Sequence, residues 1–334
     1  MEQQQSVTNE EVKPVGEYLP QVIDQIEVKS SGRAFIESNT VEGSLYEINN
    51  SHLIPVFLRE NQPLISQGEF IDATMQAVSR KFSGERILNP NIRLSHPIKG
   101  RVPDARNKPA NDLQEWEKTL YYDRLAFLIE IPSIYTDVAG NRLNLTVGGV
   151  KCYSMENLMS KNYEQHFKVF IGFQNKVCTN LCVSTDGLMG ELKVKNLGAL
   201  YNGVHYLIRE FNAVQFAQQL NLLPNYELSE SQFAHLIGRA RMYRHMPDDM
   251  KQQIPELMFG DAQINNVCRD YYSDNSFCSS PDGSINLWRL YNLFTGSNKS
   301  SYIDSYLDRA ANAFQLTTHL KEALDNRATS WFLN

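Results

Sequence analysis

The chain has 334 residues, of which 42% are hydrophobic and 21% are charged, a composition typical of a folded protein and not of a disordered one. Its densest apolar run, residues 125–131, is far shorter than the roughly 18 residues that a membrane-spanning helix needs. The net charge of −6 argues against a protein whose main task is to coat nucleic acid.

The first 30 residues differ in composition from the rest. They hold six carboxylates and two lysines, so their net charge is −4 and that of the remaining chain is only −2. Pro14, Gly16 and Pro20 interrupt any helix or strand there. We therefore predict a disordered acidic tail at residues 1–30, and the nearly neutral remainder leaves room for local basic patches.

A helix is predicted after short extended pieces between residues 33 and 57. Ser66 and Glu69 form a capping box, in which the hydroxyl accepts from the third amide and the carboxylate accepts from the amide of the cap. Apolar residues then recur at helical spacing, which predicts a helix at residues 67–82 with one buried stripe.

Alternation with a period of two predicts one strand after another in the next hundred residues. The alternating runs lie at residues 92–98, at 121–131 (a strand expected to end at Pro132), at 143–147 and at 167–173, and residues 177–183 are expected to return beside the last of these. A turn is predicted around Gly140. Because the connections are short, an antiparallel meander is favoured over parallel strands with helical crossovers.

The periodicity becomes helical after residue 195. Helices are predicted at residues 197–220, 229–246, 248–258, 261–273, 287–294 and 300–324. The fold class is therefore α+β, with an N-terminal antiparallel β-meander and one flanking helix, followed by a C-terminal helical half. The predicted domains after the tail are a sheet domain at 31–195 and a helical domain or subdomain at 196–334 packed on the sheet.

The cysteines bear on compartment and on metal binding. Five of them, without C-x-x-C spacing, and a polar start without an apolar core segment predict reduced thiols in a cytoplasmic protein. Only Cys178 and Cys182 approach the spacing of a zinc knuckle, and the sequence leaves open whether Cys152 joins them. Buried thiols are the alternative, and no metal or cofactor is expected.

The sequence favours a non-enzymatic protein over an enzyme. No carboxylates sit at a spacing that forces them together, and no histidine or acid can be assigned to a cysteine nucleophile. If the protein is an enzyme of unrecognised type, His96, His166 and Asp186 are the first residues to consider.

Residues 96–110 are the first candidate binding element. Lys99, Arg101, Arg106 and Lys108 stand there against Asp104 alone, a net charge of +3. Glycine and prolines predict a stiff, irregular loop between two strands, which could lay cations along a phosphate backbone. The alternative is a solvated hairpin tip that keeps sheet edges soluble.

The predicted helix at 229–246 is the second candidate. Ser229 and Gln232 cap it, and Arg241, Arg244 and His245 lie opposite its apolar stripe. A basic outer face suits a phosphate or an acidic partner. Basic residues near a helix C-terminus also complement the helix dipole, which is the alternative.

Aromatic residues crowd the C-terminal third. Trp288, Tyr291 and Phe294 recur at a spacing of three residues, near Arg289 and Lys299. Aromatic side chains between cations hold single strands by stacking, but this spacing is also that of ordinary core packing.

Several strings of the sequence resemble a known family. The strings are SHLIPVF (51–57), KGRVP (99–103), KVFIGFQN (168–175), CTNLCVSTDG (178–187), SQFA (231–234), LIGR (236–239), NLWRLYNLFTG (286–296) and NKSSYID (298–304). Together they resemble a bacterial family of unknown function from anaerobic gut bacteria and, more distantly, phage/plasmid-like proteins of mobile elements. The resemblance covers residue 33 to the C-terminus, and it implies a mobile-element or prophage setting but no catalytic residue.

Three hypotheses of function follow. The first is a non-enzymatic, mobile-element-associated protein that binds or anneals single-stranded nucleic acid, with Lys99, Arg101, Arg106 and Lys108 as backbone contacts and Arg241 and Arg244 as secondary ones. The second is a protein-interaction module that engages host or element proteins. The third is the enzyme of unrecognised type. The sequence does not fix the oligomeric state, and no membrane partner is expected.

Overall fold

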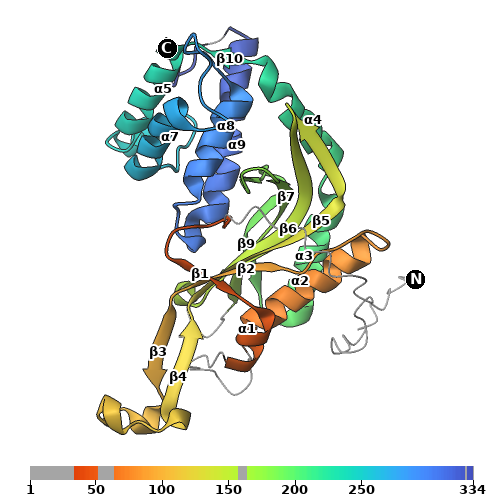
Figure 1. The fold of residues 1–334 in the computed structure, drawn as a ribbon, viewed down its shortest axis with the longest axis vertical. Helices are drawn as coiled ribbons and strands as arrows, with labels where there is room; N and C mark the ends of the chain where they lie inside the picture. The colour runs from red at the N-terminus through yellow and green to blue at the C-terminus, as the bar shows by residue number, and fades with distance from the viewer. Residues whose placement is uncertain (1–33, 52–63, 157–163, 328, 334) are drawn as a thin grey trace, which may run out of the picture. The chain divides into compact units, whose positions relative to one another are not determined.

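The computed structural model describes residues 34–51, 64–156, 164–327 and 329–333. An antiparallel sheet runs in the order β1 (Thr40–Gly43), β2 (Asn91–Ser95), β5 (Arg124–Val138), β6 (Asn141–Cys152), β7 (Gln165–Asn175) and β8 (Leu181–Cys182), with β9 (Leu188–Val194) also paired to β7 (Figure 1). Helices dominate the second half, so the predicted α+β fold is confirmed. The predicted tail at residues 1–30 lies outside the described residues, and the domain division at residue 195 stays a prediction.

The flanking helix α2 (Gln67–Lys81) begins at the capping box that the sequence predicts. The Ser66 hydroxyl accepts from the Glu69 N–H, and a Glu69 carboxylate oxygen accepts from the Ser66 N–H. Phe70 then packs edge-on against Phe127 and Phe167 of the sheet, with ring centroids 5.0 and 4.8 Å away. This helix therefore anchors one face of the sheet.

The extended pieces predicted between residues 33 and 57 are only partly present. Residues 40–43 form β1, but α1 (Leu45–Ser51) is a helix, and residues 52–57 lie outside the described chain. The prediction was wrong at α1 because Ser44 caps this short helix by accepting from the Glu47 N–H, a signal too local to show periodicity.

The long hairpin of β5 and β6 occupies the middle of the sheet. Its two-residue turn, Ala139 and Gly140, has φ values of 48° and 80°, the positive values that such turns require. The strand does not end at Pro132 as predicted but runs on to Val138. A register shift between Ile131 and Tyr135 accommodates the proline, which cannot donate to the ladder.

The sheet is covered on both faces. Leu125 and Phe127 of β5 belong to a core beneath α2 and α3 (Leu197–Glu210), whereas Ala126 and Leu128 belong to a second core beneath α9 (Ile303–Asp325). The alternation along β5 therefore separates two buried faces instead of a buried face from a wet one.

The last strand of the sheet, β9, was not predicted. Phe167 pairs with Leu192 and Val169 with Met189, so Gly190 and Glu191 of β9 stand opposite Lys168 alone. This bulge breaks the period-two pattern from which strands are read. The return strand predicted at residues 177–183 is present, although only Leu181–Cys182 (β8) pair with β7.

The helical half consists of α3, α4 (Ala213–Leu222), α5 (Glu230–Tyr243), α6 (Asp248–Lys251), α7 (Asp261–Ser273), α8 (Leu287–Asn298) and α9, with the small pair β10 (Glu227–Leu228) and β11 (Ile285–Asn286). The single helix predicted at 197–220 is two, because Asn212 caps α4 by accepting from the Gln215 N–H. The helix predicted at 248–258 is confined to α6.

The aromatic side chains of the C-terminal third form part of the core. Trp288, Tyr291 and Phe294 are all buried. In the described part of the chain, no helix combines the length and the apolar character that crossing a membrane requires.

Candidate functional site

Residues 96–110, predicted as an irregular loop, begin instead with a strand. β3 (Pro97–Arg101) pairs with β4 (Lys118–Tyr122) in a separate two-stranded antiparallel sheet, the β3–β4 hairpin (Figure 1). Short 3-10 turns at Pro103–Ala105, Ala110–Asp112 and Glu115–Glu117 lie between the two strands. The loop prediction was wrong for two reasons. The glycine and prolines of residues 96–110 are atypical of a strand, and the partner strand β4 lies beyond residue 110.

One face of the β3–β4 hairpin is basic. Arg101 stands directly opposite Lys118, and Lys99 lies two residues before Arg101. Residues directly opposite, and residues two apart on one strand, point to the same face. Register therefore gathers three cations, including Lys118, which sequence reasoning missed because its pairing cannot be read from local sequence.

Two of the predicted contacts help to hold the hairpin together. The Lys108 ammonium binds the carboxylate of Glu117, whose side chain is only 3% exposed. Arg101 donates to the Lys108 carbonyl. By contrast, Lys99 and Arg106 are exposed and have no partner among the described residues, so they remain open to a ligand.

The whole hairpin is less basic than its first half. Residues 97–122 carry five cations and the four carboxylates of Asp104, Asp112, Glu115 and Glu117, a net charge of +1. The net charge of +3 in the window at 96–110 is therefore largely balanced by the returning segment.

Trp116 is the most exposed large apolar side chain of the β3–β4 hairpin. It is 71% exposed and lies between Glu115 and Glu117. A tryptophan in an otherwise polar stretch is the signal that could have drawn attention to it, because tryptophan is enriched at binding surfaces.

Arg241 and Arg244, the second predicted group, lie at the end of α5. Arg241 binds the Asn265 side chain, and Arg244 pairs with Asp261 at 3.2 Å, both partners being on α7. These contacts join α5 to α7. Arg101 and Lys108 make their contacts within the β3–β4 hairpin, so the two predicted groups belong to different parts of the fold (Figure 1).

Cys152 and Cys178 do not have the character of nucleophiles. Burial raises the pKa of Cys152 to about 12 and that of Cys178 to about 11, so both thiols are protonated at neutral pH. Burial also raises the pKa of Cys182. Among the described residues, no three His, Cys, Asp or Glu side chains are placed to hold a metal ion.

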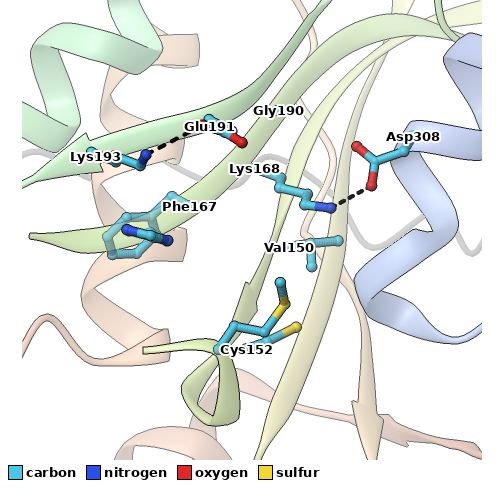
Figure 2. A pocket seen from close by; sticks show the side chains of 10 residues that line it. Val150, Cys152, Phe167, Lys168, Gly190, Glu191, Lys193 and Asp308 are labelled. Atoms are coloured by element: carbon cyan, nitrogen blue, oxygen red, sulfur yellow. Dashed lines mark hydrogen bonds and ion pairs between the residues drawn. The ribbon is translucent and has the colours of Figure 1, made fainter. Parts of the chain in front are cut away.

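A pocket of about 350 Å³ lies where β6, β7 and β9 approach α9 (Figure 2). His166 lines it, whereas His96 and Asp186, the other residues considered for catalysis, do not. Lys168 of β7 pairs with Asp308 of α9 and donates to the Asp304 carbonyl at 2.7 Å. Lys193 and Glu191 of β9 form a second ion pair at 3.3 Å.

The fold defines an α+β protein built on an antiparallel sheet. Residues 19–333 match the family described as "Domain of unknown function, B. Theta Gene description (DUF3871)", and the chain therefore belongs to this family. This confirms the predicted resemblance to a family of unknown function, one named from a gut anaerobe. Neither a curated protein nor a solved structure matches the chain.

Proposed function

We propose that the protein binds single-stranded nucleic acid through the β3–β4 hairpin and does so without catalysing a reaction. The observation that carries this proposal is the direct opposition of Arg101 and Lys118, with Lys99 on the same face. Like charges opposite each other destabilise a sheet. Lys118 pairs with Glu115 and Arg101 donates to the Lys108 carbonyl, but these contacts lie at an exposed surface, where an ion pair contributes only about 0–1 kcal/mol. An anionic backbone can therefore replace them and neutralise both cations.

Trp116 supports a single strand over a duplex. Its 71% exposed ring can stack on an unpaired base, an interaction worth about 1–3 kcal/mol per base, whereas the bases of a duplex are already stacked on each other. Arg106, exposed at the end of the turn Pro103–Ala105, adds a fourth cation to the hairpin surface.

The test is the binding of labelled single- and double-stranded DNA across a salt series. Four phosphate contacts, by Lys99, Arg101, Arg106 and Lys118, predict a slope of log affinity against log salt of about −3 for a single strand. In K99E/R106E the slope is expected to fall to about −1.4, with at least tenfold weaker binding at low salt. R86E/K195E changes the net charge equally at two exposed positions outside the hairpin and is expected to keep the wild-type slope.

An equal loss of DNA affinity in K99E/R106E and R86E/K195E would show that the total charge of the protein, and not the hairpin, governs binding. W116A separates stacking from charge, because it is expected to weaken single-strand binding about 5- to 150-fold while leaving the salt slope unchanged. No binding at low salt would remove nucleic acid from consideration.

The second candidate function is a protein-interaction module. The observation that favours it is the hairpin's net charge of only +1 around exposed Trp116 and Ile98, the latter 41% exposed. A protein partner would cover such a surface. This function predicts no nucleic-acid affinity and a partner that co-purifies with the wild type but not with W116A.

We further propose a cytoplasmic protein of a mobile genetic element, acting in replication, recombination or strand annealing. The resemblance of its sequence strings to phage/plasmid-like proteins supports the setting, and its free cysteines fit a reducing compartment. Recovery of the protein bound to DNA of the mobile element, after crosslinking in cells, tests both the mobile-element setting and the role on DNA.

A further inference from the structure

The pocket beside β9 is separate from the β3–β4 hairpin and takes no part in the function proposed for it. A bulge in β9 shapes the pocket, since Gly190 and Glu191 face Lys168 alone. Bulges redirect side chains and are frequent beside functional sites. A Cβ atom on Gly190 would lie 3.6 Å from Asp308 Oδ1, so this carboxylate oxygen sits over the glycine.

The half-buried Lys168–Asp308 ion pair of the pocket leaves one hydrogen-bond donor and one acceptor unused. The Lys168 ammonium has three N–H donors, of which Asp308 Oδ2 and the Asp304 carbonyl take two. Asp308 Oδ1 has no hydrogen-bond partner among the described residues. One cationic donor and one anionic acceptor therefore lie side by side, available to a ligand (Figure 2).

The second ion pair can open at little cost. The side chains of Lys193 and Glu191 are 45% and 82% exposed, and their charged atoms are 3.3 Å apart. Exposed pairs of this kind contribute about 0–1 kcal/mol. A ligand that offers a carboxylate to Lys193 and an ammonium to Glu191 can therefore replace their mutual contact.

We propose that this pocket binds a free α-amino acid with an apolar side chain. Lys168 and Lys193 bind the ligand carboxylate, and Asp308 Oδ1 and Glu191 bind its ammonium group. Val150, Cys152 and Met155 contact the apolar side chain. The volume of about 350 Å³ suits so small a ligand.

The balance of charge is the reason for choosing a zwitterion. The two lysines meet two carboxylates, so a ligand that is only anionic would face the repulsion of Asp308 and Glu191. A ligand that is only cationic would likewise face the two lysines. An α-amino acid carries a carboxylate and an ammonium group on neighbouring atoms, so it can match the lysines and the carboxylates of the pocket at the same time.

The experiment is calorimetric titration of the full chain with three matched probes. L-leucine carries both charges, 4-methylpentanoate lacks the amine, and 3-methylbutylamine lacks the carboxylate. Leucine is expected to bind at least tenfold more tightly than either analogue. The proposal is overturned if leucine does not bind, or if one analogue binds as tightly as leucine.

Two variants locate the site without removing either member of the Lys168–Asp308 pair. Lys193→Gln removes an exposed charge and is expected to weaken leucine binding about tenfold. Gly190→Val fills the pocket and is expected to abolish binding; Gly190 does not adopt the left-handed backbone that only glycine favours. Lys195→Gln, at an exposed position two residues beyond Lys193, is the control and is expected to bind as wild type. Leucine binding that survives both Lys193→Gln and Gly190→Val would place the site elsewhere.

Discussion

The hairpins β5–β6 and β3–β4 are both antiparallel pairs, yet they are stabilised differently. β5–β6 is buried on both faces, between α2 and α3 on one side and α9 on the other. The strands β3 and β4 pair only with each other in the described structure. They are held by backbone hydrogen bonds and by the contacts Lys108–Glu117, Arg101–Lys108 and Lys118–Glu115.

The contrast teaches where substitutions should affect stability and where they should affect binding. Side chains of β5–β6 are fixed by packing, so changes there cost folding free energy. Exposed side chains of β3–β4 are free of such packing, so changes there leave stability intact and report on a ligand. The following predictions test this contrast, beginning with the largest effect.

Lys151→Met in β6 is expected to have the largest effect. The Lys151 ammonium lies 2.8 Å from Glu156 Oε1, both side chains are fully buried, and the ammonium lies 3.9 Å from the centroid of the Phe167 ring. Removing the lysine leaves a buried carboxylate without its partner, so urea unfolding should show a loss of about 3–5 kcal/mol.

The double variant Lys151→Met/Glu156→Gln is the control for this pair. It removes both charges and is expected to recover stability to within about 2 kcal/mol of the wild type, because no unpaired charge remains. A double variant no more stable than Lys151→Met would show that packing of the lysine stem, and not charge pairing, accounts for the loss.

A matched pair of glycine substitutions compares the hairpins directly. A Cβ atom on Gly149 of β6 would lie 2.4 Å from Phe70 Cζ and 2.6 Å from the Lys168 carbonyl oxygen. On Gly100 of β3 it would meet only Thr119 Oγ1, at 2.7 Å, which can rotate away. Thermal unfolding should therefore show a loss of about 1–3 kcal/mol for Gly149→Ala and a change within about 0.5 kcal/mol for Gly100→Ala. Equal losses of stability in Gly149→Ala and Gly100→Ala would contradict the proposed difference between the two hairpins.

The smallest effect is a local response of the β3–β4 hairpin to acid. The hydrogen bond from Lys108, followed by that from the Gln114 N–H, lowers the pKa of Glu117. The stabilisation by Glu117 is therefore complete above the ordinary carboxyl pKa of about 4.3 and is lost as the pH falls below it through the lowered value. Trp116 fluorescence should change in that range before global unfolding, and Glu117→Gln should remove the change. If the fluorescence change persists in Glu117→Gln but disappears in Glu115→Gln, protonation of Glu115 and not of Glu117 causes it.

Much of the fold could be predicted because its signals are local. The capping boxes at Ser66 and Ser229 and the turn at Gly140 are confirmed. Strand β9 was missed where its bulge breaks the alternation, and the pairing of β3 with β4 depends on register, which no local pattern encodes.

The candidate sites were less predictable because tertiary contacts decide them. Lys108 reads as an available cation until Glu117 is seen to bind it. Lys168 and Asp308 are 140 residues apart in sequence and meet only because α9 packs on the sheet. Exposure distinguishes Trp116 from the buried Trp288, although both read as aromatic residues near charges.

The late position of α9 in the chain has a consequence during synthesis. Ile303, Tyr306 and Leu307 close one core, and Phe314, Leu316 and Leu320 of the same helix close the other. At about 5–20 residues per second, the ribosome needs roughly 10–35 s to extend the chain from the end of β6 to the end of α9. Throughout that interval the nascent sheet presents an apolar face, so the growing protein is a candidate client for ribosome-associated chaperones until its last long helix emerges.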